Sequence, residues 1–163
     1  METFEDLLKF EDKKHKEFFL PYYQKVGWKV VKDYVGTNSD YDVLIDRNGQ
    51  QIRIDEKAIR KEWNDFVIEI IQDLKTGSPS WLYKKKDIYL YASWQDIEQI
   101  NPSSLYEVRA EILKEYIAKE AESLLEYKRF RISNKVFGTT LFVVIPLKEL
   151  LQLEIARQLK TQN

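Results

Sequence analysis

Two aspartates and a lysine lie within a short segment that has the pattern of a β-hairpin. The segment YDVLIDRNGQQIRIDEKAI, residues 41–59, contains Asp42, Asp55 and Lys57. Asn48-Gly49 favours a two-residue turn, because both residue types tolerate the positive φ angles of a type I′ turn. A turn of that length places Asp42 directly opposite Asp55. Lys57 then follows on the same face, because side chains alternate along a strand.

The opposite face of this predicted hairpin is apolar. A three-residue loop would shift one strand by one position, so that Glu56 would replace Asp55 and Ala58 would replace the lysine. The two-residue loop instead gathers four aliphatic side chains on one face: Val43, Ile45, Ile52 and Ile54. We therefore interpret that face as the core face and the acidic face as the one available for chemistry.

Two carboxylates directly across a sheet repel one another, and a divalent cation between them would turn repulsion into coordination. Their Cβ atoms would lie ~4.5–5.5 Å apart, close enough to share one ion. The chain has no cysteine and a single histidine, so any metal is expected on carboxylates, which suit Mg²⁺ or Mn²⁺. In the metal-free protein, we expect Asp55→Asn to relieve the repulsion. The alternative is a hairpin whose polar face is only solvated.

The order of the acidic residues and the lysine follows a known pattern. A predicted helix carries Glu17, Asp42 opens one strand, and Asp55-Glu56-Lys57 closes the next. This order resembles the PD-(D/E)xK nuclease superfamily, in particular the archaeal Holliday junction resolvases and small phage-type nucleases. The resemblance covers residues 10–60. Tyr41 stands where the motif often has proline, and the acid of the triplet is Asp rather than Glu.

The resemblance implies a restriction-endonuclease-like mixed central sheet flanked by helices, and hydrolysis of DNA phosphodiester bonds with Mg²⁺ or Mn²⁺. It implies that Lys57 orients the attacking water or stabilises the developing negative charge. The metal would be held by four groups: Asp42, Asp55, the backbone carbonyl of Glu56, and Glu17. Two alternatives remain, namely a nuclease-fold module that binds nucleic acid or protein without activity, and an α/β protein with a structural hairpin.

Further assignments depend on the first helix and on the end of the hairpin. Glu17 follows Phe10 by seven residues, which places both on one face of an α-helix. Glu11 is the alternative acid. We expect His15 on the helix surface, without a chemical role. The Glu56 side chain is expected to be structural, in contact with Tyr41 across the hairpin or with a basic neighbour.

Local groups of basic and aromatic residues are candidates for contact with nucleic acid. The formal net charge of −1 provides no overall basic field, so binding would depend on local patches and would weaken with salt. Charge runs are otherwise solvated faces. The candidates are a lysine run, two arginines, a tryptophan that could stack on bases, and a glutamine beyond the motif lysine: Lys84, Lys85, Lys86, Arg129, Arg131, Trp81 and Gln72.

The 163 residues fit one domain, residues 1–163, of mixed α/β class. Residues 65–71 fit a strand or a helix, and their β-branched content favours a strand. The remaining patterns predict a helix over 4–26 that bends at Pro21, a loop over 76–80, strands over 28–35, 41–47, 51–58, 87–93 and 139–145, and helices over 101–127 and 146–159.

The expected location and partners of the protein follow partly from features that the sequence lacks. There is no apolar run of the ~18 residues that a membrane helix needs, so we expect no membrane partner. The lack of cysteine and of a secretory signal favours the cytoplasm. DNA is the expected partner, and symmetrical cleavage of two strands would call for a homodimer. Branched, duplex and single-stranded substrates stay open, as do endonuclease and exonuclease action.

Overall fold

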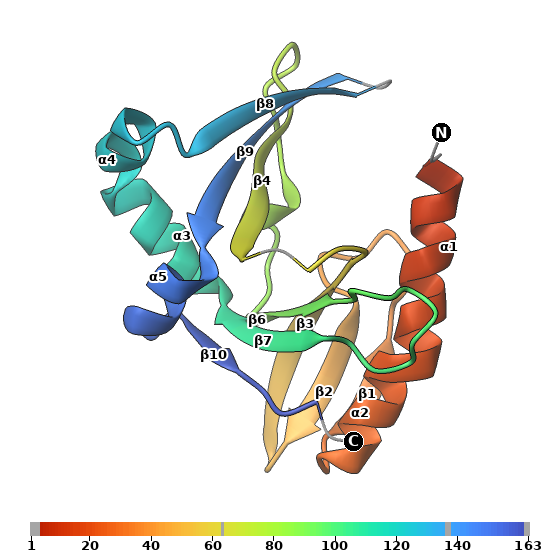
Figure 1. The fold of residues 1–163 in the computed structure, drawn as a ribbon. Coiled ribbons are helices and arrows are strands. Elements are labelled where there is room, and N and C mark those ends of the chain that lie inside the picture. The colour runs from red at the N-terminus through yellow and green to blue at the C-terminus, as the bar shows by residue number, and fades with distance from the viewer. Residues whose placement is uncertain (1–3, 63, 136–137, 162–163) are drawn as a thin grey trace.

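The chain folds into two β-sheets with helices beside them, which confirms the expected mixed α/β class (Figure 1). The structure, a computed structural model, describes residues 4–62, 64–135 and 138–161. Within these residues, a six-stranded sheet runs in the order β1-β2-β3-β6-β7-β10 and a four-stranded sheet in the order β5-β4-β9-β8. The first sheet is mixed, because β3 and β6 are parallel and its other pairs are antiparallel.

The first sheet contains β1 (Lys29–Asp33), β2 (Val43–Arg47), β3 (Gln50–Ile59), β6 (Ile88–Ser93), β7 (Ser104–Arg109) and β10 (Ala156–Gln158). The second sheet contains β4 (Asp65–Asp73), β5 (Ser78–Pro79), β8 (Phe130–Lys135) and β9 (Gly138–Pro146). The helical segments are α1 (Phe4–Lys14), a π-helical turn (His15–Phe19), α2 (Leu20–Lys25), a short 3₁₀ turn (Trp81–Tyr83), α3 (Ala110–Lys119), α4 (Ala121–Glu126) and α5 (Leu147–Gln152).

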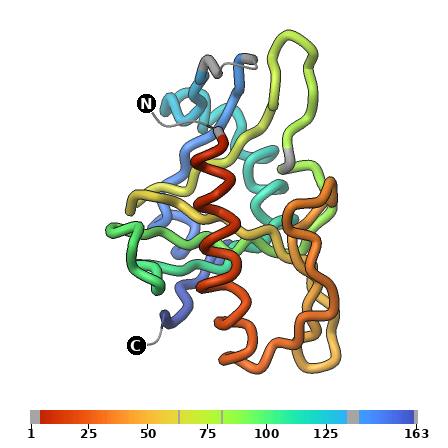
Figure 2. Tube along the Cα trace, turned by 90° about the vertical axis from the view of Figure 1, so that its right-hand side faces the viewer, coloured from red at the N-terminus to blue at the C-terminus, as the bar shows by residue number. Residues whose placement is uncertain are grey.

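Two apolar cores lie on opposite faces of the first sheet. One joins α1 and α2 to the face that carries Val43 and Ile54. The other joins the opposite face to the second sheet, α3 and α5. Figure 2 shows the first helical segment crossing in front of the strands. The middle strands of the first sheet are therefore covered on both sides, and charged side chains that point from them are withdrawn from water.

The first helical segment contains a π-turn that keeps its buried residues on one side of the segment. A regular α-helix repeats every 3.6 residues, so a stripe with a four-residue repeat would drift around it. The wider turn at His15–Phe19 corrects that drift. The buried positions form two four-residue series: Phe10, Lys14, Phe18 and Tyr22, and beside them His15, Phe19 and Tyr23. The segment ends before Gly27, whose φ is +77°.

The β2–β3 hairpin has the predicted register. Asn48 and Gly49 have φ angles of 56° and 83°, as a type I′ turn requires. Val43 pairs with Ile54 at the end of the β2 ladder, whereas the ladder with β6 continues to Ile59. Among the described strands, residues 55–59 of β3 therefore have a partner on one side only. This open edge begins at the acidic residues.

The later part of the chain corrects two predicted helices. The helix expected over 101–127 begins only at Ala110, because Ser104–Arg109 forms β7. That strand is buried on both faces, so it lacks the alternating pattern that marks a half-exposed strand. The helix expected over 146–159 ends at Gln152, and β10 follows it. Strand β8 was not expected, residues 65–71 form a strand, and the loop over 76–80 contains the short β5.

Among the described residues, no helix combines the length and the apolar character that are needed to cross a membrane.

Candidate functional site

Asp55 lies at the centre of a buried group of charges on β3. Only 5% of its surface is exposed. The ammonium group of Lys57 is 2.9 Å from Oδ1 of Asp55, and the ammonium group of Lys86 donates a 2.6 Å hydrogen bond to Oδ2. Oδ2 of Asp42 accepts a 2.7 Å hydrogen bond from the backbone N–H of Glu56. The structure thus brings Asp42, Asp55 and Lys57 together at the open edge of the hairpin.

The two aspartates carry the negative charge unequally. Burial opposes the ionisation of Asp55, but Lys57 and Lys86 outweigh this and lower its pKa. Burial and the nearby charge of Asp55 raise the pKa of Asp42 to about 8, and Lys57 offsets this only in part. The expectation that Asp55→Asn would relieve the repulsion is therefore reversed. Asp55 is the paired acid, and Asp42 is the acid whose charge lacks compensation.

Lys57 is held as a cation inside this group. Burial opposes its charge, but Asp55 and Asp42 more than compensate and raise its pKa. Its side chain as a whole retains 23% exposure. A positively charged donor beside two carboxylates at an accessible edge is chemically suited to stabilise an oxyanion that is brought to the same edge.

Lys86 is the residue of this group that the sequence pattern misplaces. It was expected on an exposed basic run, but only 2% of its surface is exposed. Its ammonium group lies 5.0 Å from the centre of the Tyr89 ring. Desolvation lowers the pKa of Lys86, although the adjacent Asp55 favours its charge. In the sequence, Lys86 is the third of three consecutive lysines, and nothing in that run distinguishes the buried lysine from the exposed ones.

The backbone next to Lys86 is fixed by an ion pair. Asp87 accepts hydrogen bonds from the guanidinium of Arg53 at 2.9 and 2.7 Å. It also accepts a 2.7 Å bond from the backbone N–H of Arg53, and its own N–H donates to the Arg53 carbonyl at 3.0 Å. These contacts clamp the start of β6 to β3. The backbone that carries Lys86 is therefore held in place by its neighbour Asp87.

Glu11 reaches the acidic group from α1. Together with Asp42 and Glu56 it lines a groove of ≈ 530 Å³. Glu11 is exposed as a residue, but partial burial of its carboxyl group raises its pKa, while the charge of Lys57 acts in the opposite direction. The carboxyl group also senses the charge of Asp55. Glu11 is therefore the acid of the first helix that approaches the hairpin site.

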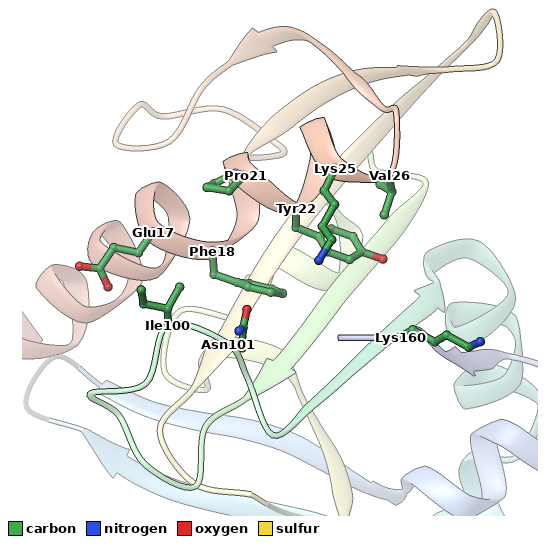
Figure 3. A pocket seen from close by; sticks show the side chains of 9 residues that line it. All are labelled: Glu17, Phe18, Pro21, Tyr22, Lys25, Val26, Ile100, Asn101 and Lys160. Atoms are coloured by element: carbon green, nitrogen blue, oxygen red, sulfur yellow. The ribbon is translucent and has the colours of Figure 1, made fainter. Parts of the chain in front are cut away.

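Glu17 does not join this group. It is exposed and lines a different pocket, of ≈ 380 Å³, with Phe18, Tyr22 and Ile100. Figure 3 shows its carboxylate directed away from the ring of Tyr22. The expectation that Glu17 shares a face with Phe10 is wrong, because the buried stripe advances by four residues and the seventh position after Phe10 rotates out of it.

A second buried polar network occupies the other face of β3. His15 lies between Glu56 and Asp33, with Nδ1 2.7 Å from the Glu56 carboxylate and Nε2 2.8 Å from the Asp33 carboxylate. The hydroxyl of Tyr23 donates a 2.7 Å bond to Glu56. Burial opposes the charge of His15, but the two carboxylates raise its pKa to about 9.

This network corrects one expectation and supports another. His15, expected on the surface, is only 3% exposed. Glu56 contacts a basic neighbour, as expected of a structural side chain. The missed signal is the spacing of His15, Phe19 and Tyr23, four residues apart, which places the histidine on a buried stripe.

The nucleic-acid candidates are scattered over several elements. Lys84 and Lys85 are exposed before β6, and Gln72 is exposed near the end of β4. Arg129 is half-buried and Arg131 is exposed, at the start of β8. The side chain of Trp81 lies outside the described part of the structure. The structure thus removes Lys86 from the exposed candidates and leaves Lys84, Lys85, Gln72 and Arg131 as exposed groups.

The acidic group fits a hard divalent cation that keeps most of its water. Among the described residues, no three or more His, Cys, Asp or Glu side chains are arranged to hold a metal ion. Mg²⁺, however, is usually bound by one or two carboxylates together with water. The raised pKa of Asp42 shows that its ionisation beside Asp55 is disfavoured, and such a cation would favour the ionised form. The donor set therefore fits Mg²⁺ or Mn²⁺.

The arrangement combines two adjacent carboxylates, a cationic donor and an open strand edge. Lewis-acid or proton-transfer chemistry on an anionic substrate is what these groups can support. A comparison of the chain with family models, with curated proteins and with solved structures finds no match.

Proposed function

We propose that the protein is a Mg²⁺- or Mn²⁺-dependent deoxyribonuclease with a restriction-endonuclease-like fold of the PD-(D/E)xK type. The observation that supports it most is the meeting of Asp42, Asp55 and Lys57 at the open edge of β3. The order of a helix, a hairpin and a following parallel strand agrees with this proposal. So does the inward position of the Glu56 side chain, which leaves its backbone carbonyl as the proposed metal ligand.

Each acidic residue has a distinct part in the proposed reaction. Asp42 and Asp55 would hold the cation, and Glu11 would take the part that the family resemblance implies for Glu17, because it is the helix acid beside Lys57. When bound, the cation would act as a Lewis acid on the scissile phosphate and on the attacking water. The open edge of β3 admits the phosphate, since residues 55–59 have no strand on that side in the described structure.

Lys57 acts as a charged donor rather than as a base. Its raised pKa keeps the ammonium protonated at neutral pH. From its position beside Asp55 it orients the attacking water or stabilises the negative charge that develops on the phosphate. Symmetrical cleavage of a duplex by this mechanism would require two copies of the chain, each with its own site.

A second candidate function rests on a different observation. Both carboxylate oxygens of Asp55 already contact ammonium groups, as in a structural ion cluster. An inactive module that binds nucleic acid or protein through the same fold would be built in this way. Metal binding separates the two candidates, because a ligand that binds only the native state must stabilise it.

The test measures DNA cleavage and thermal stability with Mg²⁺, with Mn²⁺ and with EDTA. Four-way junctions, flaps, duplex and single strands serve as substrates. We expect cleavage with either metal, and we expect Lys57→Ala to slow it ~10²–10³-fold while it retains the metal-induced rise in Tm. Asp55→Asn should abolish both cleavage and the rise. Lys148→Ala is the matched control, because Lys148 is exposed on α5 and has no part in the proposed site. Absence of cleavage and of any metal-induced shift would favour the inactive module.

A further inference from the structure

Lys86 is a buried cation for which the proposed reaction has no part. Its side chain is 1% exposed, and it meets Asp55, the proposed metal ligand, at 2.6 Å. Lys57 occupies the other oxygen of the same carboxylate at 2.9 Å. A metal ion that binds Asp55 through Oδ2 needs the position that the Lys86 ammonium holds.

The contact between Lys86 and Asp55 is fixed by the residues around it. Asp55 pairs with Tyr89 across the β3–β6 ladder, and Lys86 lies over the Tyr89 ring, which directs its ammonium back onto Asp55. The Arg53–Asp87 ion pair holds the adjoining backbone. A buried carboxylate without a partner is costly, so this contact keeps Asp55 ionised and in place without metal.

We propose that Lys86 is a built-in counter-ion, which occupies the cation position on Asp55 in the metal-free protein and is displaced from it when a divalent metal binds. This inference rests on the proposed metal site. It gives Lys86 a positioning role: the residue preserves the metal-free site and competes with the metal. Lys57 stays beside Oδ1, and the clamp at Asp87 lets the Lys86 side chain turn away without disturbing β6.

If Lys86 competes with the metal for Asp55, replacing Lys86 in the full chain should lower the stability of the metal-free protein and raise its affinity for metal. For Lys86→Met, we expect a lower Tm without metal, because Asp55 loses a partner. We also expect Mn²⁺ to bind about tenfold more tightly in calorimetric titration, because no ammonium has to be displaced. A lysine that merely supported the site would lower both stability and affinity. Lys85→Met, at an exposed neighbour, should change neither.

Lys86→Gln provides a second variant if the Met variant does not fold, because its neutral amide can still donate to Asp55. The wild-type protein gives a third measurement. We expect Mg²⁺ to increase the labelling of Lys86 by an amine reagent, as read by mass spectrometry. Lys14, which is fully buried and donates to the Gln99 carbonyl, serves as the control and should stay protected.

The outcomes separate this inference from the proposed function. If wild type binds Mn²⁺ and Asp55→Asn does not, the metal site stands. Equal or weaker binding by the Lys86 variants, or unchanged labelling of Lys86 with bound Mg²⁺, then overturns the counter-ion alone. Tight binding by the variants and weak binding by wild type supports it. If neither wild type nor the Lys86 variants bind Mn²⁺, both proposals fall.

Discussion

The two faces of β3 bury charge in different ways. On one face, Glu56 receives hydrogen bonds from His15 and Tyr23, and the second nitrogen of His15 is paired with Asp33. On the other face, Asp55 is shared by two lysines while the charge of Asp42 remains poorly compensated. The first network is satisfied by the protein itself. The second leaves an electrostatic cost that a cation from solution would remove.

This contrast indicates which face is built for stability and which for a ligand. A buried network whose members are all paired makes the fold specific. A buried acid whose ionisation is opposed by a neighbouring carboxylate weakens the fold as the pH rises, and such perturbed acids gather at functional sites. The same strand thus supports both kinds of site because successive side chains point to opposite faces.

The largest change in the free energy of unfolding should come from a substitution on the face of β3 that carries Glu56. Glu56→Ala leaves the His15 charge and the Tyr23 hydroxyl without their buried partner. We expect it to lower the free energy of unfolding by about 3–5 kcal/mol, as measured by urea denaturation. The cleavage rate of the molecules that remain folded should change little, because the contribution of Glu56 to the proposed site is its backbone carbonyl. A loss of less than ~1 kcal/mol would show that this network is not structural.

Asp42→Asn should have a smaller effect of opposite sign. A folded-state pKa raised from 3.8 to about 8 means that Asp42 contributes stability below pH 4, which is lost as the pH rises towards 8. Without metal, the variant should therefore be more stable than wild type at pH 8, by a few kcal/mol, and equal to or less stable than wild type near pH 4.

Urea titrations from pH 4 to 9 measure this difference. His15, with a folded-state pKa of about 9, also loses its stabilising contribution as the pH rises, between its ordinary value of 6.5 and 9. Because His15 is present in both proteins, the difference between variant and wild type isolates Asp42. Asp55→Asn serves as the contrast, since it removes the partner of two lysines and should destabilise. Stabilisation by both substitutions would mean that the two acids are equivalent.

The sequence predicted the hairpin because its determinants are local. The turn at Asn48-Gly49 sets the register, and the register sets which carboxylates meet. Residues brought in from a distance were not predictable in this way. Lys86 reads as part of a solvated run, and only its packing against Tyr89 turns it inward. Glu17 follows an α-helical spacing, which the π-turn at His15–Phe19 alters. Pro21 predicts an irregularity in this helix but not the wider turn that moves Glu17 off the buried face.

The smallest effects are expected for substitutions of the two acids of the first helical segment, Glu11 and Glu17. Glu17→Gln should change the free energy of unfolding by less than ~0.5 kcal/mol and leave metal-dependent cleavage unaltered, because Glu17 is exposed and away from β3. Glu11→Gln should leave stability nearly as it is but slow cleavage and reduce the Mn²⁺-induced rise in Tm. Both variants are measured in the same assays, and a reversed ranking would restore the sequence-based assignment.

The parallel pairing of β3 with β6 has a consequence for the order of folding. The β2–β3 hairpin closes through neighbouring residues, and hairpins form in ~1–10 μs. The contact between Asp55 and Lys86 spans 31 residues, and it requires the β4–β5 excursion to be completed first. Long-range parallel pairing is slow because its loop must close before any contact is gained. We therefore expect a refolding chain to acquire hairpin structure early and the buried contact between Asp55 and Lys86 late.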